Sequence, residues 1–81
     1  MKHGQPVTIG GVIVARQHPP TANGVCFLAV EDTDGIVNVV VMPDVYARDR
    51  SAAHGVFVVV KGVMQWDGGA IHVIAQALTA V

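Results

Sequence analysis

Residues 25–42 read Val25-Cys26-Phe27-Leu28-Ala29-Val30-Glu31, then Asp32-Thr33-Asp34-Gly35, then Ile36-Val37-Asn38-Val39-Val40-Val41-Met42. The first and third segments are rich in β-branched and other apolar residues, and the middle segment consists of turn-forming residues. This arrangement predicts two strands, over 25–31 and 36–42, that are joined by a tight turn. Pro43 and Asp44 follow directly, and a proline with an acidic neighbour predicts the start of a short helix over 43–51.

Three further strands are predicted on the two sides of this region. The first covers 7–17, and Gly10-Gly11 inside it indicates a bulge or a sharp bend. A loop over 18–24 follows, because that segment is rich in proline and glycine. Strands over 56–65 and 70–78 come after the helix, and Asp67-Gly68-Gly69 predicts a hairpin turn between them.

The composition favours the same fold class. The chain has 81 residues, of which 52% are hydrophobic and 14% are charged, so a single domain over 1–81 is expected. Seventeen valines and five isoleucines stand against two leucines, and stiff β-branched side chains fit pleated sheets. Cys26 is the one cysteine, which excludes an intramolecular disulfide. The net charge of −1 excludes a strongly basic, nonspecific nucleic-acid binder.

We expect the predicted sheet to close into a barrel, because its strands are apolar and would otherwise leave exposed edges. An open sheet of five such strands would leave two unpaired edges, and exposed edges promote aggregation. A closed barrel removes them, with the long first strand bending between its two halves and the helix plugging one end. The expected fold is therefore all-β with one short helix, a five-stranded Greek-key barrel of the OB type with the order β-β-β-α-β-β. An SH3-like barrel is the alternative, although it usually lacks a helix between the third and fourth strands.

OB barrels bind oligonucleotides or oligosaccharides on strands two and three and on the loops that follow strands one and four. Alternation along the second strand assigns Cys26, Leu28 and Val30 to the core and Phe27 to the outer face. Asn38 of the third strand shares that outer side. A solvent-facing ring beside an amide suits a base, since the ring stacks on it and the amide bonds its edge. The alternative is that Phe27 packs under a loop and Asn38 is ordinary surface.

Further candidates for nucleic-acid contact lie at strand ends and loops. Arg16 could contact phosphate or stack on a base, and a solvated strand end is the alternative. Trp66 lies beside the predicted hairpin and could stack on a base, or fold over the barrel mouth, or contact a partner protein. The remaining candidates are His18, Asn23, Lys61 and His72.

Catalytic, metal and membrane functions find little support in the residues. Asp32 and Asp34 lie in a turn, which such carboxylates commonly shape. The four histidines, at 3, 18, 54 and 72, lack metal-ligand spacing, and no P-loop is present. No apolar run approaches the roughly 18 residues of a membrane-spanning helix. We therefore expect no catalytic residue, cofactor or metal, no membrane partner, and a cytoplasmic location.

Most of the chain, about 7–78, resembles the OB domain near the C-terminus of bacterial C-family replicative polymerases, and especially the error-prone alpha subunit. The specific motifs are Arg16-Gln17-His18-Pro19, the block Asn38-Val39-Val40-Val41-Met42-Pro43 and the segment Gly68-Gly69-Ala70-Ile71-His72. A looser block over 27–35, Phe-Leu-x-Val-Glu-Asp-x-x-Gly, is shared with anticodon-binding OB domains of class II aminoacyl-tRNA synthetases.

This resemblance implies a domain excised from a larger polymerase, which helps to hold single-stranded template during replication or translesion repair. It implies no catalysis here, because the nucleotidyl-transfer carboxylates of that family lie in a separate palm domain. In the synthetase relatives, the aromatic residue matching Phe27 stacks on an anticodon base, and the polar residue matching Asn38 reads a base edge.

The chain departs from the family pattern where cations are usual. The family loop usually has Arg at His18 and often Lys at Asn23, and Trp66 replaces a basic or polar residue. Because binding by counterion release scales with the phosphates neutralised, weak, sequence-nonspecific binding of single-stranded DNA is expected, with a shallow salt dependence. The near-neutral charge also keeps two alternatives open. One is a protein-interaction module that docks the polymerase to accessory factors, and the other is a free-standing tRNA- or RNA-binding protein.

Overall fold

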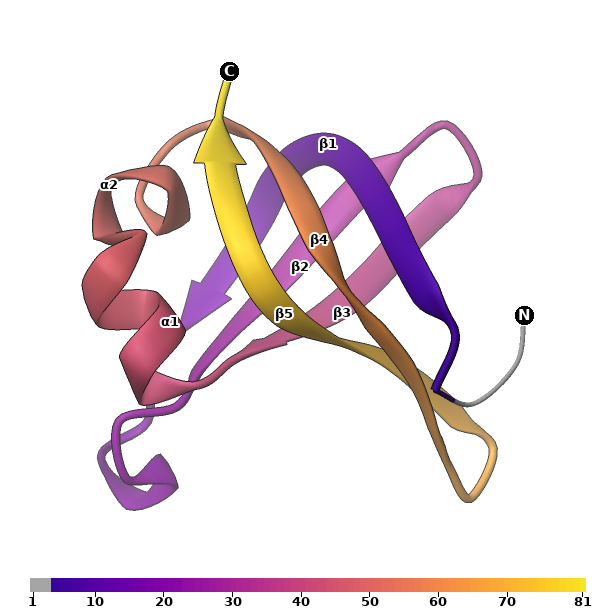
Figure 1. The fold of residues 1–81 in the computed structure, drawn as a ribbon, viewed down its shortest axis with the longest axis horizontal. Coiled ribbons are helices and arrows are strands. Elements are labelled where there is room, and N and C mark those ends of the chain that lie inside the picture. The colour runs from indigo at the N-terminus through magenta and orange to yellow at the C-terminus, as the bar shows by residue number, and fades with distance from the viewer. Residues whose placement is uncertain (1–3) are drawn as a thin grey trace.

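The computed structural model describes residues 4–81 as a closed barrel of five strands with helices at one end (Figure 1). The strands are β1 (Pro6–Gln17), β2 (Cys26–Asp32), β3 (Gly35–Val41), β4 (Phe57–Asp67) and β5 (Ala70–Ala80). The helices are η1 (Pro20–Ala22), a 3-10 turn between β1 and β2, and α1 (Pro43–Arg48) and α2 (Arg50–Ala53) after β3. Strand bounds therefore lie within two residues of those predicted.

The barrel closes in the order β1-β2-β3-β5-β4, and β4 pairs back with β1. Neighbouring strands are antiparallel except β3 and β5, which run parallel where Asn38 lies beside His72. With helices between its third and fourth strands, the structure confirms the OB-type barrel over the SH3-like alternative. Within residues 4–81, no helix combines the length and the apolar character needed to cross a membrane.

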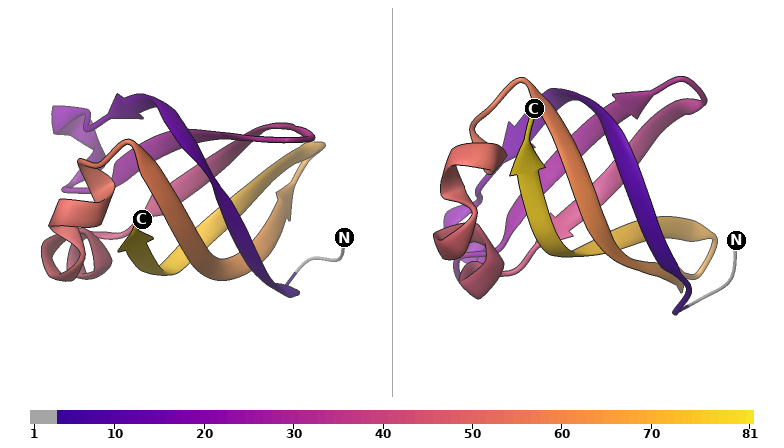
Figure 2. Two further views of the ribbon diagram at one scale, coloured as in Figure 1. Left: turned by 90° about the horizontal axis from the view of Figure 1, so that it is seen from above. Right: turned by 45° about the horizontal axis from the view of Figure 1, so that its top comes forward.

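β1 bends between the two halves of the barrel (Figure 2). Its first half pairs with β4 and its second half with β2, and the change of partner occurs at Val12. The register irregularity lies between Ile13 and Ala15 rather than at the expected Gly10-Gly11. Gly11 is needed for a different reason, because a Cβ atom there would collide with the backbone carbonyl of Glu31.

Both predicted turns are confirmed. Asp32 Oδ1 accepts a hydrogen bond from the backbone N–H of Asp34 at 2.7 Å, so this carboxylate stabilises the turn between β2 and β3. In the β4–β5 hairpin, Gly68 and Gly69 have φ angles of 58° and 96°. Such left-handed backbone is what a two-residue hairpin loop requires, and glycine adopts it without steric cost.

The prediction of a single helix over 43–51 is wrong in one respect. The segment forms two short helices, and Asp49 separates them. The side chain of Asp49 accounts for the break. Its Oδ2 atom accepts a hydrogen bond from the backbone N–H of Leu78 in β5 at 2.9 Å and pairs with the Arg48 guanidinium at 2.9 Å. Arg48 also donates to the carbonyl of Gln76 at 2.5 Å. Hydrogen bonds of Arg48 and Asp49 with the backbone of β5 thus hold the helices against this strand.

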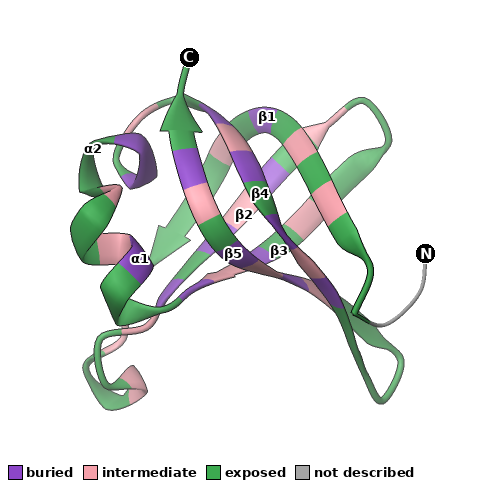
Figure 3. Ribbon diagram, in the orientation of Figure 1, coloured by how far each residue is buried: buried purple, intermediate pink, exposed green. Residues whose placement is uncertain are grey.

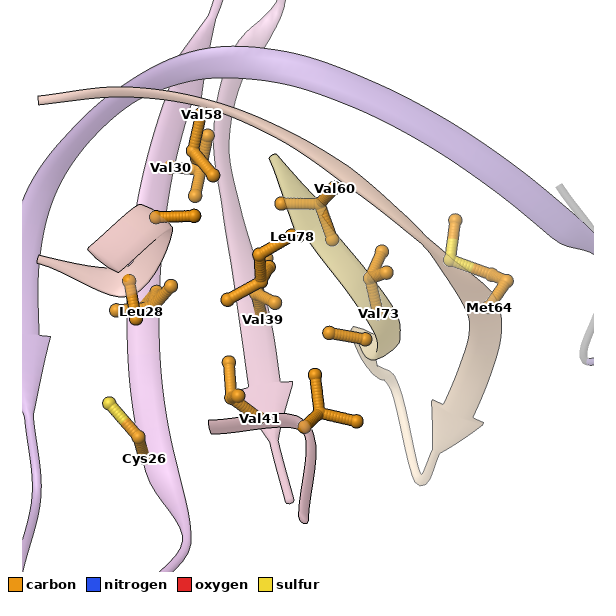
Figure 4. Close-up of a cluster of buried hydrophobic side chains, with 14 residues drawn as sticks. Cys26, Leu28, Val30, Val39, Val41, Val58, Val60, Met64, Val73 and Leu78 are labelled. Carbon is orange, nitrogen blue, oxygen red and sulfur yellow. The ribbon is translucent and has the colours of Figure 1, made fainter. Parts of the chain in front are cut away.

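The core lies inside the barrel, where side chains from the strands meet (Figure 4). Figure 3 marks the buried positions along the strands and helices. Cys26, Leu28 and Val30 are at most 2% exposed, which confirms the predicted inner face of β2. The remaining buried strand residues are Val39, Val41, Val58, Val60, Met64, Val73, Ala75 and Leu78. Val45, Ala52 and Ala53 of the two helices join the same cluster, which confirms that the helical segment plugs one end.

Candidate functional site

The outer face of the barrel carries a shallow hollow of about 310 Å³ over β1, β2, β3 and β5. We call it the outer-face hollow, and its lining consists of Ala15, Gln17, Phe27, Leu28, Ala29, Asn38, Val39, Val40 and His72. Three predicted site residues, Phe27, Asn38 and His72, thus come together although they lie on three different strands.

A first row of side chains crosses the outer-face hollow beside the β1–β2 loop. Gln17 lies opposite Phe27, and Phe27 lies opposite Val40. Directly opposed residues of antiparallel strands share one face of the sheet. Phe27, a residue that is 39% exposed, is therefore flanked by an amide on one side and an apolar side chain on the other.

A second row runs parallel to the first and becomes polar toward β4. Ala15 lies opposite Ala29, and Ala29 lies opposite Asn38. Asn38 is the parallel-strand neighbour of His72, which in turn lies opposite the exposed Gln65. The two small alanines leave space beside the phenyl ring, and two amides and an imidazole continue the row.

The outer-face hollow can bind a ligand by stacking and hydrogen bonding rather than by ion pairing. None of the residues that line the outer-face hollow is Lys, Arg, Asp or Glu. The ring of Phe27 can stack on any base, while the amide and imidazole groups of Asn38 and His72 can donate or accept hydrogen bonds. Gln17 and Gln65 belong to the same surface and were not among the predicted candidates. The strand periodicity that selected Phe27 could have found Gln17, once the register between β1 and β2 was known.

Arg16 is directed toward α2 rather than into the outer-face hollow. Its Nε atom donates to the carbonyl oxygen of Ala53 at 2.6 Å, and a terminal nitrogen donates to that of Gly55 at 3.0 Å. The guanidinium therefore satisfies carbonyl groups at the end of the helix, a common role for a basic side chain. Two of its five N–H donors are engaged in this way, so Arg16 has a structural function, and its contact with phosphate stays a prediction.

His18 belongs to an aromatic and basic group beside the helices, which we call the Tyr46 cluster (His18, Tyr46, Arg50, His54). The His18 and Tyr46 ring centroids are 4.8 Å apart, and the Tyr46 hydroxyl shares a hydrogen bond with His54 Nε2 at 2.5 Å. The Arg50 guanidinium carbon is 5.9 Å from the centre of the Tyr46 ring. Sequence reasoning missed this cluster, because no local pattern relates His18 to residues so far along the chain.

Two other candidates lie outside the outer-face hollow. Asn23 is exposed in the β1–β2 loop with a φ angle of 54°, in the left-handed region that asparagine tolerates. Lys61 is exposed on β4 between Thr8 of β1 and Ala77 of β5, neither of which lines the hollow.

Trp66 is 59% exposed but lies on the other face of the hairpin from His72. It is opposite Ile71, and alternation places both side chains on the same side as the buried Met64 and Val73. The structure therefore separates Trp66 from the outer-face hollow and directs it toward the mouth of the barrel.

The thiol of Cys26 lies behind the outer-face hollow, in the core. Burial raises the pKa of this thiol, and the positive charge of Arg16 opposes part of that rise. Since the thiolate is the reactive form, the side chain is a poor nucleophile at neutral pH. Among residues 4–81, no group of three His, Cys, Asp or Glu side chains is placed to hold a metal ion.

Residues 7–81 match the family described as OB-fold nucleic acid binding domain. Similar curated proteins include the error-prone DNA polymerases of Pseudomonas paraeruginosa, 44% identical over 79 residues, and Mycobacterium tuberculosis, 42% identical over 76 residues. These matches cover 96% and 93% of this chain but only 8% and 7% of the polymerases, so the chain spans a small part of their length.

Solved structures share the fold. Asparaginyl-tRNA synthetase from Pyrococcus horikoshii superposes with a TM-score of 0.79 at 23% identity, over 98% of this chain and 20% of the synthetase. An OBody bound to hen egg-white lysozyme superposes with a TM-score of 0.76 at 18% identity, over 98% of this chain and 80% of that one. The resemblance to the error-prone polymerase region is thus confirmed by sequence identity, and the barrel by structure. The chain belongs to the family of OB-fold nucleic acid binding domains.

Proposed function

We propose that this chain is a single-stranded-DNA-binding module of an error-prone DNA polymerase alpha subunit and acts in replication or translesion repair. The observation that carries the proposal is an exposed aromatic ring, Phe27, in one hollow with Asn38 and His72. The identity of 40–44% to error-prone polymerases supports the assignment to that class of parent protein.

Binding of a single strand would rest on stacking. One base stacks on Phe27, an interaction worth about 1–3 kcal/mol, and every base has a face that can stack. Asn38 and His72 then donate to or accept from whichever base edge or sugar lies beside them. Because these groups do not form a fixed bidentate pattern for one base, the module binds without sequence preference.

Charge contributes little to this binding. Among residues 4–81, Lys, Arg, Asp and Glu are absent from the lining of the outer-face hollow, and Arg50 is the arginine of the Tyr46 cluster. Each phosphate neutralised on a single strand contributes about −0.7 to the slope of log K against log salt. With one or two phosphates contacted, the affinity is weak and the slope is no steeper than roughly −1.4.

The experiment is a titration of the isotope-labelled chain with oligo-dT at low salt, followed by amide chemical shifts. We expect shifts at Phe27, Asn38 and His72, and a loss of affinity of about fivefold or more in Phe27→Ala, from the lost stacking. Phe57→Ala is the matched control, since Phe57 is 43% exposed on β4 and does not line the hollow.

The absence of shifts at millimolar oligonucleotide, or an equal loss of affinity in the two phenylalanine variants, would contradict the proposal. Oligo-rU in a parallel titration tests the other nucleic acid. Tighter binding of oligo-rU than of oligo-dT would replace DNA by RNA as the ligand.

A further inference from the structure

The barrel end opposite α1 and α2 holds a second hollow, of about 260 Å³. Residues of β1, of the β2–β3 turn with the start of β3, and of β4 and β5 line it, and Figures 1 and 2 show the turn and the hairpin on the side of the barrel away from the helices. We call it the open-end hollow, and its lining consists of Val7, Ile9, Asp32, Asp34, Gly35, Ile36, Val37, Met64, Ile71 and Val73. It shares no residue with the outer-face hollow.

The open-end hollow presents apolar side chains that a barrel normally covers. Buried core residues Met64 and Val73 reach its floor, and Ile36 and Ile71 at its edge are 59% and 48% exposed. The indole of Trp66 lies next to this edge, since it is opposite Ile71 across the hairpin. An exposed apolar patch that joins the core, with an aromatic ring beside it, is typical of a protein contact.

The rim of the open-end hollow is acidic. Asp32 and Asp34 belong to its lining, and Glu31 is opposite Ile36 of the lining. Three of the six acidic residues of the chain therefore lie in or beside this lining. Among residues 4–81, no Lys or Arg lines the hollow. Three arginines, Arg16, Arg48 and Arg50, lie instead on or against the helices at the opposite end, together with Asp44 and Asp49.

The acidic rim of the open-end hollow indicates which kind of molecule can bind there. A nucleic-acid strand would bring phosphates against carboxylates, and symmetric pairing of two copies through this end would bring two acidic rims together, so both are disfavoured. A protein segment with a large apolar side chain flanked by Lys or Arg suits both parts of the hollow. The apolar side chain packs on the floor, and the cations pair with the carboxylates of the rim. We infer that the open-end hollow docks such a basic, apolar protein segment, independently of the strand bound in the outer-face hollow.

A peptide titration tests this inference. The labelled chain is titrated with a short synthetic peptide that repeats Lys-Leu-Lys, and with a second peptide that repeats Glu-Leu-Glu. We expect the basic peptide alone to bind, with amide shifts centred on Asp34, Ile36 and Ile71, and added salt to weaken the complex.

Two variants and one control assign the contact to the open-end hollow. Ile71→Ser is expected to lower the affinity for the basic peptide about tenfold, as loss of an apolar anchor does. Asp34→Lys is expected to lower it as well, through charge alone, since the turn uses only the backbone N–H of Asp34. Val14→Ser is the matched control, because Val14 is as exposed as Ile71 and lines neither hollow.

The same variants separate this inference from the proposed function. Ile71→Ser should leave oligo-dT affinity unchanged, so failure of peptide binding and failure of DNA binding are observed independently. Peptide-induced shifts centred on the outer-face hollow, or equal affinity in Ile71→Ser and wild type, would overturn the inference. Self-association of the unliganded chain through Ile36 and Ile71 would overturn it too, by assigning the surface to a second copy.

Discussion

Neighbouring residues 26 and 27 have opposite environments because side chains alternate along a strand. Phe27 faces solvent and Cys26 is 1% exposed. Burial raises the pKa of the Cys26 thiol above its ordinary value, so the thiolate fraction at pH 8 is lower than in an unfolded chain. We expect the thiol to resist an aromatic disulfide reagent in the native chain and to react rapidly in guanidinium. Rapid native labelling would mean that β2 opens locally.

At the scale of the elements, Asp49 joins the helices to β5. Hydrogen bonds from Arg48 and from the backbone N–H of Leu78 hold the pKa of Asp49 below its ordinary value. A lowered folded-state pKa means that this stabilisation is complete above the unfolded pKa, about 3.9. It is lost as the pH falls through the folded value.

Asp49→Ala is therefore expected to lower the free energy of unfolding by about 1–2 kcal/mol at pH 7, since a backbone N–H loses a charged acceptor. The difference from wild type should shrink as the pH falls through the folded-state pKa of Asp49, because the carboxyl group is then protonated in both states. Urea denaturation at pH 7 and at a series of lower pH values measures this. Asp67→Ala, at the exposed hairpin, is the control. A pH-independent loss of stability would show that packing, and not charge, fastens the helices.

The bend of β1 depends on a close approach between strands. Gly11→Ala is expected to lower the free energy of unfolding by about 1–3 kcal/mol, because the added methyl group meets the Glu31 carbonyl and the strands must separate. Gly10→Ala is a control one residue away, where the nearest atom would be 3.8 Å from the new Cβ. Urea titrations of both variants compare them, and equal destabilisation would contradict a steric cause.

At the scale of the whole molecule, Arg16, Arg48 and Arg50 lie at the helical end of the barrel together with Asp44 and Asp49, whereas Asp32 and Asp34 line the other end. If the few cations near the β1–β2 loop limit DNA binding, Asn23→Lys should strengthen binding of oligo-dT and steepen the slope of log K against log salt by about 0.7. Thr8→Lys adds the same charge on β1 opposite Lys61, away from the outer-face hollow. Fluorescence anisotropy of labelled oligo-dT at several salt concentrations measures both variants. An identical slope change in the two would show that only net charge matters.

Local periodicity was sufficient to predict the strands and the inner face of β2, because the sheet imposes a period of two wherever one face is buried. The two turns were also predictable, since glycine and aspartate favour particular backbone angles wherever they occur. The break at Asp49 was not, because it depends on Leu78, which is 29 positions away. The structural role of Arg16 depends in the same way on Ala53, at a separation of 37 positions.

The amino-acid sequence by itself determined an all-β chain with an outward Phe27, an inward Cys26 and a net charge of −1. These properties follow from composition and alternation, which act between near neighbours. Only the tertiary structure decided which outward side chains share a surface. Barrel closure brings Phe27, Asn38 and His72 together and directs Trp66 to the open end, because strand register, set by pairing across the whole sheet, determines which side chains are neighbours.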